Sequence, residues 1–169
     1  MQQQSPCELS AISAASSIRS GGLSSDVFHE EVIKRYDSRM KFYNAMLHGF
    51  TTDAIRAQLK AAAVLRSKAK IGSAPPVTAA GPLASVPFLL SNNIDVSGLP
   101  STAGNAVLAS GKATRDAPLV ESLKRAGAIF FGHANTHELN LGSTCSHPQH
   151  GTVKSVSMER RNRCSPFIF

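Results

Sequence analysis

The sequence contains few of the residues that mark several common classes of protein. It has no tryptophan, two tyrosines and three cysteines in 169 residues. Cys7, Cys145 and Cys164 are odd in number and widely separated, which argues against a disulfide framework and is typical of a reducing cytosol. No apolar run approaches the roughly 20 residues of a membrane helix, and the first residues do not form a secretory signal. We therefore expect a cytoplasmic protein with no membrane segment.

The net charge of +7 is compatible with nucleic-acid binding, but the placement of the charges disfavours it. Most basic residues between Lys41 and Lys70 lie along expected helices, where they would form a solvated face. Arg160, Arg161 and Arg163 make only a small cluster, and the chain lacks the interleaved basic and aromatic residues that stack on bases. We expect no nucleic-acid partner.

The pattern of residues 1–70 predicts a helical segment. One helix is expected over Glu8–Ser20, with Leu9, Ile12 and Ile18 as its larger apolar residues, and Gly21 and Gly22 end it. Ser24 or Ser25 begins a second helix with Asp26 in its first turn, and Thr51 or Thr52 begins a third. The expected buried faces, read from three- and four-residue spacing, consist of Val32, Ile33, Tyr36 and Met40 in the second helix and of Ile55, Leu59, Ala62 and Ala63 in the third.

Residues 71–153 begin with a Gly- and Pro-containing crossing over 71–81 and continue with alternating strand and helix patterns. The expected elements are a strand over 86–94, a helix over 117–126, a strand over 128–131 and the start of a helix over 136–141. Asp116 is a candidate cap of the 117–126 helix, Pro118 suits its first turn, and Leu119, Val120 and Leu123 form its expected buried side. This alternation predicts an α/β fold with parallel pairing.

Two stretches in this second segment carry a more specific pattern. Residues 81–104 read GPLASVPFLLSNNIDVSGLPSTAG, and residues 115–142 read RDAPLVESLKRAGAIFFGHANTHELNLG. They resemble the front of the catalytic domain in the amidase signature family, the Ser-Ser-Lys amide hydrolases, whose run is close to G-P-L-x-G-I-P-x-x-x-K-D-N-I-D-V-x-G-x-P-T-T-A-G. The resemblance implies an α/β domain in which N-terminal helices precede part of a mixed sheet, here incomplete.

The family's catalytic lysine falls on Ser91, and Asn92 replaces the acidic residue usual beside it. A serine hydroxyl has no neutral base form near pH 7 and is several bonds shorter than lysine, so no catalytic residue of the family is intact here. The positions that match the family's motifs are Asn93, Asp95, Gly98, Pro100, Thr102, Gly104, Asn135 and Glu138.

Residues 154–169 depart from the family altogether. The family continues with an N-P-Y-like turn and a glycine- and serine-rich loop, whereas this chain reads KSVSMERRNRCSPFIF. Ser165 lies near the position of the proton-passing serine, and the attacking serine would fall beyond Phe169. One explanation is a shifted reading frame, because Ser155-Val156-Ser157 can be encoded TCC GTA TCN, which gives Pro-Tyr when read one base later. The other is a genuine, short and divergent terminus.

Three hypotheses of function follow from this pattern. The chain is a truncated or degenerate amidase without catalysis, a non-catalytic binding or regulatory module, or an active amidase whose sequence contains a frameshift. The family implies a small carboxamide substrate for the full domain, and no metal or organic cofactor. A truncated sheet would expose an unpaired edge and apolar faces, so we also expect a homo-oligomer or pairing with a full-length relative.

Two other site chemistries are weaker. His133, His137, Cys145, His147 and His150 cluster in sequence, and polar loop histidines explain them better than a zinc site does. A Ser–His hydrolase built on Ser91 with His133 or His137 lacks the G-x-S-x-G elbow. We expect Phe130 and Phe131 to lie in the core.

Overall fold

The computed structural model describes residues 5–47, 52–53, 55–57, 60, 81–108 and 111–154. The chain divides into two compact units. The first unit comprises Met1–Arg35, Thr51–Phe88 and Glu121–Phe131, and the second comprises Tyr36–Phe50, Leu89–Val120 and Gly132–Phe169. Within the described ranges, no helix has both the length and the apolar character needed to cross a membrane.

The first predicted helix is present, but it begins later than expected. A 3-10 turn, η1 (Pro6–Glu8), precedes α1 (Ala11–Arg19), and the Ser10 side chain caps α1 by accepting a hydrogen bond from the Ser13 amide at 3.2 Å. Gly21 ends it with a φ of 78°, which a residue with a side chain rarely adopts. The buried residues of α1 are small, Ala14 and Ala15, whereas Ile12 is 77% exposed.

The second helix, α2 (Ser25–Arg35), carries Asp26 in its first turn and buries Phe28, His29 and Ile33. The predicted buried face of this helix is confirmed only in part, because Val32 and Tyr36 are half-buried. The chain passes from α2 into a π-helical turn, η2 (Tyr36–Met40), and then into α3 (Lys41–Tyr43). A π-helical turn inserts a residue into the α-helical repeat, so a face extrapolated at constant spacing shifts around the helix there.

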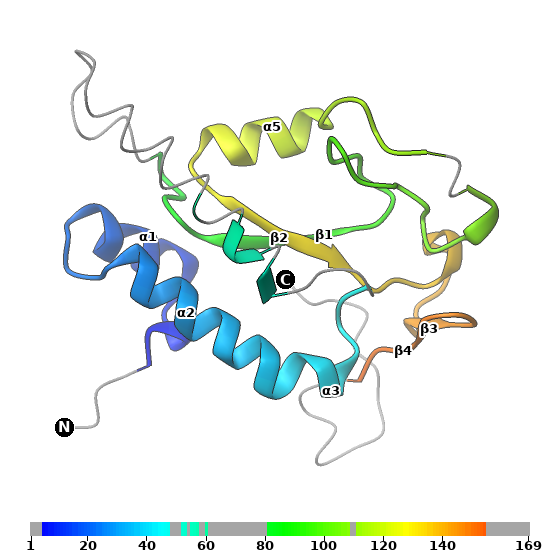
Figure 1. Cartoon of the computed structure of the whole chain (residues 1–169), viewed down its shortest axis with the longest axis horizontal. Coiled ribbons are helices and arrows are strands. Elements are labelled where there is room, and N and C mark those ends of the chain that lie inside the picture. Colours follow the sequence, from blue (N-terminus) through cyan, green and yellow to red (C-terminus); the bar gives the residue numbers. More distant parts are fainter. Residues whose placement is uncertain are drawn as a thin grey trace. The chain divides into compact units, whose positions relative to one another are not determined.

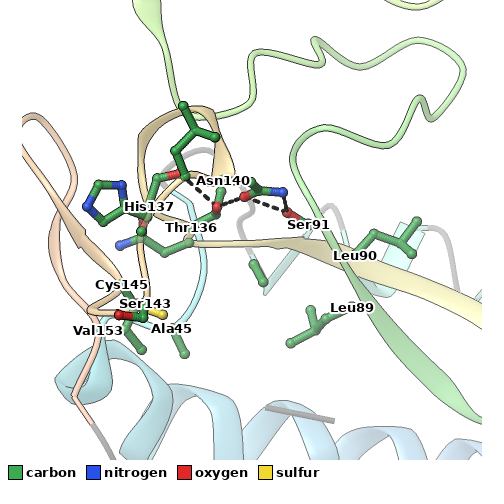
Figure 2. A pocket seen from close by; sticks show the side chains of 14 residues that line it. Ala45, Leu89, Leu90, Ser91, Thr136, His137, Asn140, Ser143, Cys145 and Val153 are labelled. Carbon is green, nitrogen blue, oxygen red and sulfur yellow. Dashed lines mark hydrogen bonds between the residues drawn. The ribbon is translucent and has the colours of Figure 1, made fainter. Parts of the chain in front are cut away.

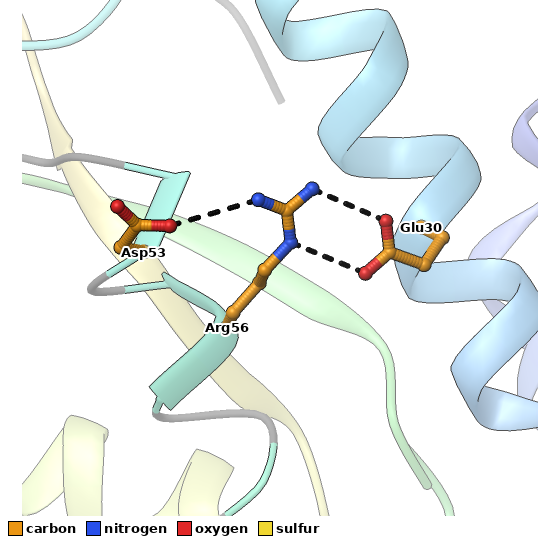
Figure 3. Close-up of polar contacts among 3 residues, drawn as sticks. All are labelled: Glu30, Asp53 and Arg56. Atoms are coloured by element: carbon orange, nitrogen blue, oxygen red, sulfur yellow. Dashed lines mark hydrogen bonds and ion pairs between the residues drawn. The ribbon is translucent and has the colours of Figure 1, made fainter.

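The third predicted helix is present where the structure describes it, and an ion pair links it to α2. Thr52, Asp53 and Ile55 are helical, and Ile55 is fully buried. Arg56 contacts both carboxylate oxygens of Glu30 at 3.3 Å and Asp53 at 3.7 Å (Figure 3). Hydrogen bonding from Arg56 lowers the pKa of the Glu30 carboxyl. These groups are exposed, so the pair orients the helices more than it stabilises them. Thr51, Leu59, Ala62 and Ala63 lie outside the described residues.

The central sheet joins β1 (Pro87–Ser91) to β2 (Ile129–Ala134), with α5 (Pro118–Arg125) between them in the chain (Figure 1). Three backbone hydrogen bonds flank the strands, from Leu83 N to Ala126 O, from Ser85 N to Gly127 O and from Ile129 N to Val86 O. Their partners advance together along both segments, as in parallel strands, which agrees with the βαβ prediction. In β2 the run from Ile129 to His133 is buried, including Phe130 and Phe131 as predicted, whereas β1 fully buries only Leu90.

Three sequence predictions need correction. The 86–94 strand ends at Ser91, because Asn92 and Asn93 form a turn. The 128–131 strand extends through Ala134. The helix predicted over 136–141 is only a 3-10 turn, η4 (Glu138–Asn140), because Leu139 and Asn140 have φ values of 54° and 56°. A left-handed backbone cannot continue an α-helix.

Helix α5 starts at Pro118, which was expected in its first turn. Its neighbouring apolar residues Leu119 and Val120 differ in burial. Val120 is fully buried and Leu123 is half-buried, but Leu119 is 52% exposed, so its predicted burial is wrong. The Asp116 carboxylate, expected as the helix cap, accepts a hydrogen bond from the Ser97 amide at 2.7 Å.

We predict that Val120→Ala lowers the free energy of unfolding by about 1–3 kcal/mol, because it removes buried methyl groups and leaves a cavity. Leu119→Ala, its neighbour on the same helix, should change stability by less than about 0.5 kcal/mol. Urea denaturation followed by circular dichroism measures both variants. Equal losses in the two variants would show that α5 packs differently.

Candidate functional site

Ser91, the residue that the sequence resemblance aligns with the family's lysine, lies at the end of β1 and lines a cavity of about 720 Å³ in the second unit (Figure 2). The other lining residues are Ala45, Leu89, Leu90, Ala134, Asn135, Thr136, His137, Asn140, Leu141, Gly142, Ser143, Cys145 and Val153. None of these lining residues is an Asp, Glu, Lys or Arg. The described walls of the cavity therefore combine apolar side chains with polar ones and hold no carboxylate, lysine or arginine.

The Ser91 hydroxyl is engaged with an amide rather than with a histidine. Asn140 Nδ2 donates to Ser91 Oγ at 2.9 Å, and Ser91 Oγ lies 3.2 Å from Asn140 Oδ1 (Figure 2). Thr136 Oγ1 also donates to Asn140 Oδ1. An amide side chain cannot remove a proton from a hydroxyl near pH 7, so these contacts position Ser91 without activating it.

Asn92, beside Ser91, connects the end of β1 to the loop that contains the S-T-A-G motif. It is buried, its Oδ1 accepts a hydrogen bond from Thr102 N at 2.9 Å, and its carbonyl accepts one from Ala103 N at 2.8 Å. Sequence reasoning noted Asn92 only as a departure from the family. Its position directly after a buried strand was the available signal for a structural role.

The motif residues Asn93 and Asp95 are exposed, and their turn contributes through its backbone. Asp95 O accepts a hydrogen bond from Ala117 N at 2.9 Å. Gly98, with a φ of 83°, donates its amide to Ala113 O at 2.9 Å, and Pro100 forms an isolated antiparallel bridge with Lys112. These motif residues therefore shape a part of the loop that does not line the cavity.

The motif residues Thr102 and Gly104 shape the loop itself. Thr102 Oγ1 accepts a hydrogen bond from Gly104 N at 3.1 Å, and Gly104 has a φ of 76°. A Cβ added at Gly104 would lie 3.0 Å from the His147 ring. Gly104 therefore satisfies both a left-handed backbone and a close contact, which only glycine does without strain.

His147 is a buried residue of this site that sequence reasoning read as a polar loop histidine. It lies on β3 (Ser146–His147), which pairs with β4 (Gly151–Thr152) in a short hairpin. Its Nδ1 accepts hydrogen bonds from the amides of Gln149 and His150, both at 3.0 Å. The proton of the neutral ring must then be on Nε2, which donates to Gly104 O. No sequence signal pointed to this contact.

The last two motif residues, Asn135 and Glu138, make structural contacts. Asn135 Nδ2 donates to Asn44 O at 3.2 Å and to His150 O at 3.3 Å, which ties the end of β2 to the hairpin. Glu138 Oε1 accepts a hydrogen bond from Asn105 Nδ2 at 2.7 Å. Buried oxygens without a hydrogen-bond partner in the described part of the chain include Ser101 Oγ and Asn135 Oδ1.

The histidines do not form the arrangements weighed from the sequence. His133 lies inside β2 rather than after a strand, and His137 precedes η4, so the two share no helix face. Across the ranges that the structure describes, no group of three or more His, Cys, Asp or Glu side chains is placed to hold a metal ion. Burial lowers the pKa of the His133 imidazole, and a main-chain hydrogen bond with Ile94 opposes that shift.

A family model described as Amidase matches residues 30–162. The chain is 34% identical over 143 residues to an indoleacetamide hydrolase of Bradyrhizobium diazoefficiens, covering 84% of this chain and 25% of that protein. It is 33% identical over 158 residues to an acylamidase of Rhodococcus erythropolis, covering 91% of this chain and 31% of that protein. The chain thus spans a quarter to a third of the length of these relatives.

Solved structures show the same partial correspondence. A vestigial protein complex, said to reveal the origins of an s-triazine catabolic enzyme, matches with a TM-score of 0.68 and 28% identity over 85% of this chain and 30% of that one. A fatty acid amide hydrolase matches with a TM-score of 0.75 at 20% identity, covering 88% of this chain and 25% of that one, which supports the fold alone.

We predict that Asn92→Ala lowers the free energy of unfolding by about 1–3 kcal/mol, because the Thr102 amide loses its buried acceptor. Asn93→Ala, at the exposed neighbouring position, should change it by less than about 0.5 kcal/mol. Urea titration of both variants is the measurement. If Asn92→Ala is as stable as Asn93→Ala, the Asn92 side chain does not hold the loop at Thr102.

We predict that His133 makes the protein less stable as the pH falls. Its folded pKa lies below the ordinary value of 6.5, so the unfolded chain takes up a proton that the folded chain does not. Stability from this group is complete above the unfolded pKa and declines as the pH falls through that value toward the folded pKa. Melting curves between about pH 7.5 and 5.5 should show a shallower decline in His133→Gln than in the parent. An equal decline of stability with pH in the parent and in His133→Gln would contradict the assignment of this pH dependence to His133.

Proposed function

The chain belongs to the amidase family, and on that premise we propose that it supplies the opening part of a carboxamide C–N hydrolase domain. We propose further that the chain, as written, does not hydrolyse amides by the family's mechanism. What supports the second proposal is Ser91, the last residue of β1, which the family resemblance aligns with the catalytic lysine.

Amide hydrolysis needs a nucleophile, a base that activates it, and donors aimed at the developing oxyanion. The family resemblance assigns the base to a lysine, which must be kept neutral by burial. Ser91 cannot take this role, since a serine hydroxyl has no neutral base form near pH 7, and its hydrogen bonds join it to the Asn140 amide. The loops around the missing base are nevertheless held by Asn92, Thr102 and Gly104.

The relatives' names support a small carboxamide as the substrate of the complete domain. They include an indoleacetamide hydrolase, an acylamidase and a component of a glutamyl-tRNA(Gln) amidotransferase. Because the chain covers only part of each relative, the substrate of the whole protein is itself a proposal. A cytoplasmic location is also proposed, and the small, odd number of widely spaced cysteines supports it. The relative solved as a complex supports assembly with a second copy or with a full-length relative.

A chimera tests both proposals. Residues 30–153 of this chain would replace the corresponding stretch of the Bradyrhizobium indoleacetamide hydrolase, which supplies the rest of the domain. The chimera should be inert toward indoleacetamide, and Ser91→Lys should raise its turnover by at least about 100-fold, because a positioned general base contributes roughly 10²–10⁴-fold. Ammonia release measures the turnover.

Ser97→Lys in the same chimera is the matched control, because Ser97 is an exposed serine in the same unit. It adds the same charge and should leave turnover at background. A cooperative melt shows that each chimera is folded. Hydrolysis by the chimera with Ser91 in place would overturn the proposed inactivity. A folded Ser91→Lys chimera without activity would overturn the equivalence of Ser91 with the lysine.

A further inference from the structure

The cavity beside Ser91 already holds a carboxamide group, and that group belongs to the chain itself. Asn140 lines the cavity from η4, and its side chain reaches the end of β1 (Figure 2). Asn140 Nδ2 donates to Ser91 Oγ at 2.9 Å, and Ser91 Oγ lies 3.2 Å from Asn140 Oδ1. One hydroxyl therefore contacts both polar atoms of a single amide.

A second hydroxyl lies against the oxygen of the same amide. The single proton of Thr136 Oγ1 is shared between two acceptors, Asn140 Oδ1 and His137 O, the latter at 2.9 Å. Thr136 is buried and Ser91 is half-buried. The two hydroxyls thus offer protons to a carbonyl oxygen and a lone pair to an N–H group, which is the complement of a carboxamide. A carboxylate of the same shape has no N–H to donate to Ser91 Oγ.

The Asn140 side chain can be removed from this position without changing the turn that carries it. Asn140 is an exposed residue with a φ of 56°, and its side-chain hydrogen bonds run to Ser91 and Thr136. Glycine adopts this left-handed conformation without the strain that a Cβ causes. Asn140→Gly therefore takes away the amide group and leaves the backbone of η4 compatible with its present shape.

The cavity is larger than the amide that it holds. Its volume is about 720 Å³, within the range of roughly 300–1,000 Å³ that is common for small-molecule sites. An anion would lose its hydration here without meeting a lysine or arginine in the described wall. Much of the remaining wall is aliphatic, formed by Ala45, Leu89, Leu90, Leu141 and Val153. Such a wall is suited to an uncharged carboxamide with an aliphatic substituent.

We propose that Asn140 fills, from within the chain, a binding site for uncharged carboxamides and so keeps external ligands out. A group tethered to the chain competes at an effective concentration in roughly the millimolar range, so a small external amide binds only where Asn140 has been displaced. The inference goes beyond the proposed loss of catalysis, because it assigns an internal occupant to the site. It rests on the proposed function in placing the ligand beside Ser91.

Butyramide binding to the full 169-residue chain tests this proposal. Asn140→Gly should bind butyramide at least about tenfold more tightly than the parent does, because no internal amide has to be displaced first. Titration followed by the NMR signals of the backbone amides gives the Kd, and the signals that move should include those of Ser91 and Thr136. Butyrate, the anionic analogue of the same shape, should not bind to the variant.

Asn93→Gly is the matched control, because it removes an exposed amide from a turn of the same unit that does not line the cavity. It should bind butyramide only as the parent does. A cooperative melt shows that each variant is folded. A second measurement needs no variant: in the parent, high concentrations of butyramide should shift the side-chain NH₂ signal of Asn140, and butyrate should leave it in place.

Equal affinity of the parent and Asn140→Gly for butyramide would overturn the proposal, as would equal affinity of Asn140→Gly for butyrate and butyramide. An Asn140 side-chain signal that butyramide does not move in the parent would also overturn it. The chimera separates this inference from the proposed function. If Ser91→Lys activates the chimera while Asn140→Gly gains no affinity, the internal occupant is wrong and the proposed function stands. If Asn140→Gly gains affinity while the folded Ser91→Lys chimera stays inert, the internal occupant stands and the equivalence of Ser91 with the lysine fails.

Discussion

The main chain of residues 102–105 is the point at which the second unit is held together. Asn92 binds the amides of Thr102 and Ala103 from the end of β1. The turn after β2 reaches the same short segment through Leu139 N and Glu138, and the β3–β4 hairpin reaches it through His147 and Gly104 O. Three parts of the chain from different secondary-structure elements are thus hydrogen-bonded to one loop. Gly104 is buried and the residues beside it are half-buried, so these contacts are worth more than hydrogen bonds on the exposed surface.

This arrangement is compatible with the proposal that the chain retains a catalytic family's motif without its base. Gly98 and Gly104 adopt left-handed backbones, and Thr102 and Asn135 hold neighbouring loops, so these motif residues have structural roles that do not depend on residue 91. The Ser91 hydroxyl is hydrogen-bonded to the Asn140 amide, whose oxygen also accepts a hydrogen bond from Thr136. The proposed loss of a proton-transfer group would therefore leave these structural contacts in place.

The same loops connect the candidate site to the 3-10 turn η3 (Ala106–Leu108). Asn105 fixes η3 and binds Glu138, while Asn140, two residues further on, binds Ser91. The turn η4 thus connects the loop of residues 102–105 to the wall of the cavity, and its backbone has positive φ values at Leu139 and Asn140.

The sequence by itself determined the elements whose causes are local. Gly21 ends α1, Pro118 begins α5, and the apolar run at Ile129–Phe131 forms a buried strand, because each depends on backbone preference or on the character of adjacent residues. Only the tertiary structure decided that residues 138–140 form a strained turn instead of a helix, that Asn92 and His147 bind the same loop, and that Leu119 faces solvent. Those outcomes depend on hydrogen bonds and packing between segments far apart in the chain, whose free energy exceeds local preference once the segments meet and is absent from any short window of sequence.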